Sequence, residues 1–165
     1  MSTQLKSLYI MGSVIFVLTG VGSQTTGRGF GEDFNWVNLD QGLAVAKQSQ
    51  KPVMLVIHKS WCGACRALKP QFAASKEVKD LSKDFVMVNT QDDEEPNDAQ
   101  YAPDGNYIPR ILFIDPQGQV MTHVYNELGN PSYKYFYSDA ESVTAAMRKV
   151  KDSMKKQTGT TSEEL

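Results

Sequence analysis

The feature that most constrains this chain is the segment Trp61-Cys62-Gly63-Ala64-Cys65, which holds the only two cysteines among its 165 residues. Two cysteines separated by two residues can switch between a dithiol and a disulfide. One pair cannot supply the four ligands of an ordinary structural zinc site or a framework of several disulfides. A disulfide closing so short a loop would also restrict the unfolded chain only modestly. The pair therefore indicates redox chemistry at a single centre.

No cofactor is expected, and no metal ion. The metal-binding alternative requires two chains that each lend their cysteine pair to one shared four-thiolate site. No basic patch interleaved with aromatic residues suggests nucleic acid as a partner.

Residues 1–23 have the pattern of a secretory signal peptide. Lys6 precedes an uncharged apolar stretch, residues 8–21, which ends among small residues near Gly22 and Ser23. The stretch is shorter than the roughly 20 apolar residues of a membrane-spanning helix, so we favour cleavage near Gly22 or Ser23 over a membrane anchor. We expect no membrane association afterwards. Cleavage removes only one charge, that of Lys6, and changes the net charge from −2 to −3.

The C-terminus resembles an endoplasmic reticulum retrieval signal. The chain ends Ser162-Glu163-Glu164-Leu165, which is similar to the Lys-Asp-Glu-Leu class that a receptor reads. Ser162 and Glu163 depart from the commonest form, and an acidic disordered tail is the alternative. Residues 24–156 should form one domain and residues 157–165 a disordered tail. Both ends together predict the endoplasmic reticulum lumen, or secretion where the signal is not read.

Hydrophobic patterning predicts an α/β fold with helices packed on a mixed sheet. Apolar runs without alternation are typical of strands that are buried on both faces. The predicted strands are residues 53–57, 85–89 and 110–114, with 119–125 returning antiparallel after a tight turn and 133–137 as an edge strand. The predicted helices are residues 39–49, a segment following the cysteines, and a terminal helix whose Ser138 and Glu141 form a capping box. Residues 27–31 are predicted to be flexible.

Cys62 lies just past the carboxyl end of the first buried strand, where sites form in such sheets. At a helix N-terminus, unpaired N–H groups and the helix dipole favour its thiolate. Cys65, one helical turn later, would be shielded and act as the resolving thiol. Cys62 would attack a substrate disulfide and Cys65 would break the resulting mixed disulfide; the reverse sequence would oxidise a substrate dithiol.

These motifs resemble the thioredoxin superfamily. The resemblance rests on a strand leading into Trp61-Cys62-Gly63-Ala64-Cys65, on Pro70 five residues later, and on Ile108-Pro109 before a strand. Within the superfamily, His58 to Cys65, Asp92 to Pro96 and Asn130 to Tyr137 resemble small endoplasmic reticulum oxidoreductases related to the anterior gradient proteins. The resemblance covers nearly the whole mature chain. It implies a thioredoxin fold, with Cys62 as the nucleophile and Cys65 as the resolving thiol.

The resemblance also implies that Pro109 is a cis-proline facing the cysteines. A cis bond would hold the backbone of Ile108 open for an extended substrate to pair with as an added strand. The implied substrate-binding residues are Trp61, Gly63, Ala64, Ile108 and Pro109. From the residues alone, a trans proline that begins an edge strand is the alternative.

The sequence departs from the superfamily pattern inside the fold. Thioredoxins and disulfide isomerases usually bury a carboxylate six residues before the first cysteine, facing a lysine, and this chain has Val56 and Met87 there. The proton acceptor for Cys65 must then come from elsewhere, such as water. His58 is a substitute, although a strand histidine is more often simply hydrogen-bonded in the packing.

Client proteins with cysteines are the expected substrates, and glutathione or another oxidoreductase is the expected redox partner. The alternative is a chaperone or adaptor that holds clients on the same face without redox turnover, although such a protein has little use for both cysteines. The acidic cluster Asp92–Glu95 lacks the spacing of a calcium loop, so we expect a solvated acidic loop near the site.

Overall fold

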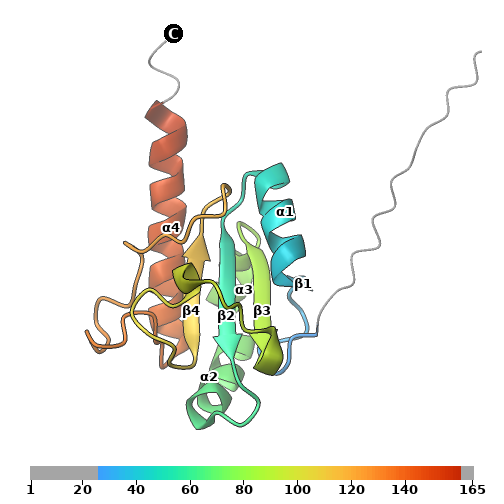
Figure 1. The fold of residues 1–165 in the computed structure, drawn as a ribbon. Coiled ribbons are helices and arrows are strands. Elements are labelled where there is room, and N and C mark those ends of the chain that lie inside the picture. Colours follow the sequence, from blue (N-terminus) through green and yellow to red (C-terminus); the bar gives the residue numbers. More distant parts are fainter. Residues whose placement is uncertain (1–25, 161–165) are drawn as a thin grey trace, which may run out of the picture.

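The computed structural model describes residues 26–160 of the chain (Figure 1). Its centre is a four-stranded sheet in the order β1-β3-β2-β4. The strands are β1 (Trp36–Val37), β2 (Val53–His58), β3 (Val86–Gln91) and β4 (Arg110–Ile114). β1 and β2 run parallel to β3, and β4 runs antiparallel to β2. The mixed sheet that the sequence predicts is therefore present.

Helices cover both faces of this sheet, which confirms the predicted α/β architecture (Figure 1). One face packs against α2 (Gly63–Ala74), α3 (Lys76–Ser82) and α4 (Ala140–Thr160). The other packs against α1 (Leu39–Ser49), which forms over the predicted residues; its Ala46 is buried and its Leu43 packs at the edge of the cluster. All six residues of β2 are buried because the strand lies inside the sheet with helices on both sides.

Two predicted strands do not form. Beyond the turn at residues 115–118, only Val120 makes a bridge to Ile114. Met121 and Val124 are both buried on the same face. A spacing of three requires a turn between them, whereas a strand would place them on opposite faces. The N–H of Val124 accordingly bonds to the carbonyl of Met121.

The second missing strand is residues 133–137. Burial does alternate at its end, because Tyr135 and Tyr137 are buried while Lys134 is exposed and Phe136 is half-buried, but Tyr133 is exposed and breaks the pattern. The segment meets β4 through one backbone hydrogen bond, from Ile111 to Tyr135, so no ladder forms. The side chain of Asn126 instead donates to the carbonyl of Phe136 and holds the segment against the preceding loop.

Both ends of α4 differ from the sequence prediction. Its cap is Asp139, which accepts the N–H of Ser142 at 2.8 Å, so the predicted box between Ser138 and Glu141 does not form. Ser138 donates to the Asp139 carboxylate instead. The helix continues to Thr160, through the first residues of the segment predicted to be disordered. The predicted signal peptide and the last five residues lie outside the described part of the chain.

The N-terminal strap, residues 26–31, is ordered against the sheet and is not the flexible segment that its glycines suggest. Phe30 is fully buried, and its ring packs edge-on against Phe72 of α2. The indole of Trp36 donates to the carbonyl of Gly31. An aromatic side chain buried between a helix and the sheet therefore fixes the strap in place.

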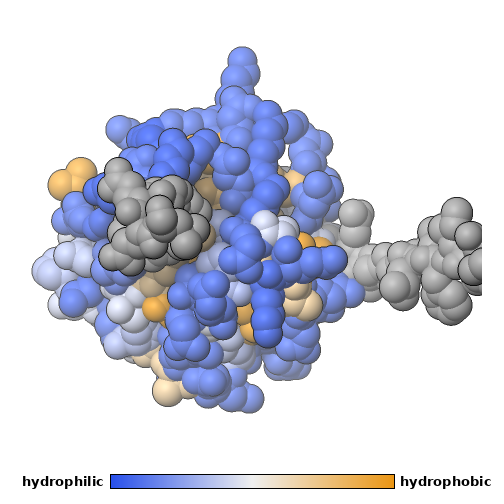
Figure 2. All heavy atoms as spheres, turned by 90° about the horizontal axis from the view of Figure 1, so that it is seen from above, coloured by the Kyte–Doolittle hydropathy of each residue, from blue (hydrophilic) through white to orange (hydrophobic). Residues whose placement is uncertain are grey.

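One face of the molecular surface is mostly hydrophilic. Figure 2 views the molecule from above, at the end where β2 begins, and this face is predominantly hydrophilic with scattered apolar residues. No helix among the described residues is long and apolar enough to cross a membrane.

Candidate active site

Cys62 and Cys65 form a disulfide at the start of α2, as the motif predicts. Cys62 is the N-cap of the helix, and its sulfur accepts the backbone N–H of Cys65 at 3.0 Å. Cys65 lies in the first turn and is fully buried, whereas Cys62 retains a little exposure at 6%. In the reduced form, the same N–H groups and the helix dipole would stabilise a thiolate on Cys62. The geometry thus separates an accessible sulfur from a shielded one.

Pro109 stands opposite the disulfide, and the Ile108–Pro109 peptide bond is cis. The carbonyl oxygen of Ile108 lies 3.9 Å from the Cys62 sulfur. Residues 46 positions apart in sequence are thereby brought together at the reactive atom. The predicted substrate-binding pair Ile108 and Pro109 therefore belongs to the same site as the cysteines.

The rim of the site is open and partly apolar. Trp61 is 70% exposed, and Gly63 and Ala64 are also exposed beside it. A Cβ added at Gly63 would meet no atom within 4 Å. On the other side, Tyr107, Ile108, Tyr133 and Phe136 line a cavity of about 300 Å³. The rim thus combines an exposed indole with an apolar cavity whose lining includes Ile108, the residue that contacts Cys62.

Behind the disulfide the fold is apolar. Val56 is fully buried, and Met87 retains 3% exposure within the same core cluster. No aspartate or glutamate is among the buried residues of the described chain. Position 56 therefore holds no carboxylate, and the buried residues around it include none either. Nothing acidic in this interior can take the proton of Cys65.

His58, at the end of β2, is buried without the hydrogen bond that the sequence suggests. Neither imidazole nitrogen makes a hydrogen bond of good geometry with a described residue, although the side chain of Asn89 lies near enough to raise the His58 pKa slightly. The ring packs against Phe30 of the N-terminal strap, with 5.0 Å between ring centroids. Burial, reinforced by the positive charges of Lys69 and Arg28, lowers the pKa of His58 to about 4. His58 is therefore neutral at physiological pH.

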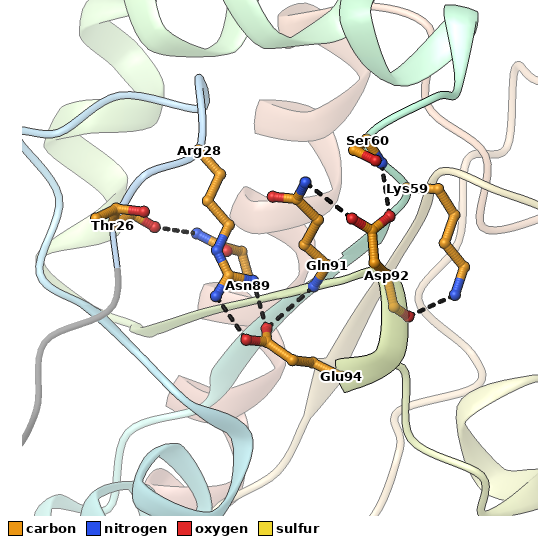
Figure 3. Close-up of polar contacts among 8 residues, drawn as sticks. All are labelled: Thr26, Arg28, Lys59, Ser60, Asn89, Gln91, Asp92 and Glu94. Carbon is orange, nitrogen blue, oxygen red and sulfur yellow. Dashed lines mark hydrogen bonds and ion pairs between the residues drawn. The ribbon is translucent and has the colours of Figure 1, made fainter.

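The acidic cluster is exposed at Asp93 and Glu94, as expected of a solvated loop, but three of its four carboxylates make hydrogen bonds or ion pairs. The carboxylate of Asp92 accepts the N–H of Ser60, directly before Trp61, and Glu94 forms a bidentate ion pair with Arg28 of the strap (Figure 3). Glu95 pairs with Lys59 and with Arg110, the residue after Pro109. Only Asp93 makes no hydrogen bond or ion pair within the described part of the chain. The described residues contain no group of three or more His, Cys, Asp or Glu side chains able to hold a metal ion.

Sequence reasoning therefore missed Lys59, Glu95 and Arg110 as residues of the site. One signal could have found them. Arg110 begins an otherwise apolar strand, and a buried guanidinium requires an acidic partner, which the nearby acidic cluster supplies.

Known proteins agree with this arrangement. A family model described as thioredoxin-like matches residues 35–116. Anterior gradient protein 3 of Mus musculus is 37% identical over 128 residues, covering 76% of this chain and 76% of the relative. The Xenopus tropicalis protein of the same name is 38% identical over 128 residues, covering 76% and 77%. A thioredoxin from Thermus thermophilus has the same fold, with a TM-score of 0.52 at 20% identity over 71% of this chain and 86% of that one.

A disulfide at a helix N-terminus, a cis-proline opposite it and relatives at this level of identity lead to one conclusion. The chain belongs to the thioredoxin-like family and is related over most of its length to the anterior gradient proteins.

Proposed function

We propose that this protein is a thiol–disulfide oxidoreductase that acts on cysteine-containing client proteins. The observation that carries the proposal is the Cys62–Cys65 disulfide, in which the less buried sulfur, that of Cys62, lies 3.9 Å from the Ile108 carbonyl before cis-Pro109. An extended client segment laid along Ile108 would pair with its backbone and present a sulfur to Cys62.

The chemistry is a two-step exchange. In the reducing direction, the Cys62 thiolate attacks one sulfur of a client disulfide, and the other client sulfur leaves as a thiolate. The Cys65 thiolate then attacks Cys62, which forms the Cys62–Cys65 disulfide and releases the second client thiolate. Two electrons pass from the protein to the client. In the oxidising direction the same steps run backwards, and glutathione or another oxidoreductase restores the starting state of the protein.

Trapping tests the roles of the two sulfurs. Cys65→Ala should accumulate mixed disulfides between Cys62 and client proteins, because the resolving thiol is absent. Cys62→Ser should accumulate almost none, since the remaining sulfur is fully buried. Non-reducing gels of cell extracts, with the double variant as the background, give the measurement. Equal trapping by both single variants would contradict the assigned roles.

The chaperone or adaptor function remains the second candidate. Exposed Trp61 and the apolar cavity at Tyr133, on the two sides of the site, favour it because such apolar groups can hold a client non-covalently. The same variants separate the two functions. An oxidoreductase loses client capture in Cys62→Ser, whereas an adaptor keeps it, including under reducing conditions.

We propose the endoplasmic reticulum lumen as the site of action, with a retrieval receptor reading the C-terminus. The support is the signal-peptide pattern of residues 1–23 together with the ending Glu163-Glu164-Leu165. Deleting these three residues should release the protein into the medium of secreting cells, which immunoblotting of medium and lysate would measure. Equal retention of both chains would contradict retrieval.

A further inference from the structure

The segment between β3 and β4, residues 92–107, contacts both loops that meet at the disulfide. It contains the short 3-10 helices η1 (Asp92–Glu94) and η2 (Ala99–Tyr101). The first loop, residues 59–62, leads into Cys62, and the second, residues 107–109, carries the cis-proline. The proposed function uses both loops but assigns no role to this segment.

The start of the segment is attached to the cysteine loop. The carboxylate of Asp92 accepts the N–H of Ser60 at 2.8 Å, and the carbonyl of Asp92 accepts from Lys59 Nζ at 2.6 Å (Figure 3). The backbone N–H of Ser60 lowers the pKa of Asp92 from its ordinary value. The carboxylate thus remains charged at neutral pH and keeps this bond.

The end of the segment is attached to Arg110, whose side chain is 1% exposed. Its Nε donates to the carbonyl of Tyr101 at 3.2 Å and its Nη1 to the carbonyl of Tyr107 at 2.5 Å. Tyr107 directly precedes Ile108. The buried guanidinium therefore holds the backbone that leads into the cis-proline.

Glu95 connects the two attachments. One oxygen lies 2.7 Å from Lys59 Nζ and the other 2.5 Å from Arg110 Nη2. Burial opposes ionisation of this carboxyl, but the hydrogen bonds from Lys59 and Arg110 outweigh it and hold its pKa below the ordinary value. One carboxylate thus bridges two cations on opposite sides of the disulfide.

We propose that Glu95 is a positioning residue of the active site. By tying Lys59, three residues before Cys62, to Arg110, next to Pro109, it sets the spacing between the Cys62 sulfur and the Ile108 backbone. A client must reach both at once, so this spacing decides how well an extended polypeptide fits. A small thiol reagent needs only the sulfur. The inference rests on the proposed function for its effect on clients.

The chain offers a matched control. Asp93 is exposed, lies two residues from Glu95 and forms no hydrogen bond or ion pair with another described residue. Glu95→Gln and Asp93→Asn each replace a carboxylate by an amide of the same shape and remove one negative charge. Only Glu95→Gln disturbs the bridge, because each cation contacts a different Glu95 oxygen and the amide nitrogen that replaces one of them cannot accept. Lys59→Met is the second test variant, since it breaks the cysteine-loop contact and leaves the buried Arg110 paired with Glu95.

The experiment measures kcat and KM for reduction of a disulfide-bearing peptide by the chain from residue 24 onward, with glutathione as the reductant that regenerates the Cys62 and Cys65 thiols. It also measures the rate at which dithiothreitol reduces the Cys62–Cys65 disulfide. Glu95→Gln should raise KM for the peptide roughly tenfold, because displacing a positioned group by a fraction of an ångström has large effects. Lys59→Met should raise KM in the same direction. Neither should change the dithiothreitol rate relative to Asp93→Asn. Equal KM values in Glu95→Gln, Lys59→Met and Asp93→Asn would overturn the proposal.

A readout independent of turnover separates this proposal from the proposed function. In NMR spectra, Glu95→Gln should shift the amide resonances of both Trp61 and Ile108, while Asp93→Asn should shift neither. A wild-type protein that fails to reduce the peptide would overturn the proposed function, and the amide shifts would still decide whether Glu95 sets the spacing of the loops. Unshifted Trp61 and Ile108 resonances would refute the bridge.

Discussion

The two loops that meet at the disulfide are built in different ways. The cysteine loop enters α2 directly, and its sulfur is placed by a contact within four residues, from the Cys65 N–H to Cys62. The cis-proline loop is placed by Arg110, which collects two carbonyls and a carboxylate from a segment without regular strands. The position of the Cys62 sulfur therefore follows from local sequence, although Asp92 also holds Lys59 and Ser60 before it. The cis-proline loop depends on a buried charge and its distant partners.

The largest expected effect comes from removing that charge. Arg110→Met should lower the free energy of unfolding by roughly 3–5 kcal/mol, because it strips Glu95 of a partner and leaves the carbonyls of Tyr101 and Tyr107 unpaired. Urea denaturation provides the measurement. Lys83→Met, which breaks an exposed ion pair with Asp80, is the control and should have no measurable effect. If the two variants had similar urea denaturation midpoints, the cis-proline loop would not depend on the buried charge of Arg110.

A smaller effect concerns His58 beneath the N-terminal strap. The pKa of His58 is about 4 in the folded protein, below the value of 6.5 in the unfolded chain. Between these two pH values the unfolded chain therefore binds a proton at His58 and the folded protein does not. Stability from this group is present above pH 6.5 and is lost as pH falls toward 4, by about 3 kcal/mol in total. In His58→Leu, the free energy of unfolding should depend less on pH between pH 6.5 and 5 than it does in the wild-type protein. His123→Gln, which changes the other histidine, should not have this effect. A wild-type curve already flat over that range would contradict the prediction.

The third prediction concerns the interior of the cysteine side. With Val56 and Met87 in the core, no buried carboxylate of the described chain is available to take the proton of Cys65, and the neutral His58 does not titrate between pH 6 and 8. Resolution of a mixed disulfide should therefore accelerate about tenfold per pH unit up to the thiol range near roughly 8.5. Single-turnover rates would measure it, and Val56→Glu should flatten the rise. A flat wild-type profile from about pH 6 to 8 would show that another group accepts the proton.

The smallest effect tests how self-contained the cysteine loop is. Gly63 opens α2, and a Cβ there would meet nothing within 4 Å. Gly63→Ala should raise the free energy of unfolding by about 0.5 kcal/mol, because alanine restricts the unfolded chain more than glycine does. Thermal denaturation with the disulfide intact would measure the change. A clear loss of stability would mean that this loop also depends on contacts beyond its own residues.

The same contrast explains what could be predicted from sequence. β2, the cysteine pair and α2 form one contiguous run whose apolar pattern and helix start are visible in the residues themselves. The resemblance to thioredoxins added the cis bond at Pro109, which no local pattern specifies. These elements make up the reacting half of the site.

What the sequence did not reveal joins residues far apart. Arg28 and Glu94 are 66 positions apart, and Lys59 reaches Asp92 across 33. The glycines of residues 27–31 suggested flexibility, but burial of Phe30 overrides their local freedom. Tyr135 and Tyr137 alternate like a strand, yet the segment follows side-chain contacts to Asn126 rather than a ladder. Pairings between distant charges have no periodic signature, so only the fold identifies them.

The fluorescence of the two tryptophans should report the redox state of the protein. Trp61 adjoins the disulfide and is 70% exposed, whereas Trp36 is 1% exposed and donates its indole N–H to Gly31. A disulfide quenches a neighbouring indole, so reduction should brighten the long-wavelength emission of Trp61 and leave the blue-shifted emission of Trp36 unchanged. The ratio of the two signals reports the state of the Cys62–Cys65 couple in solution without a label, and the buried indole serves as the internal standard.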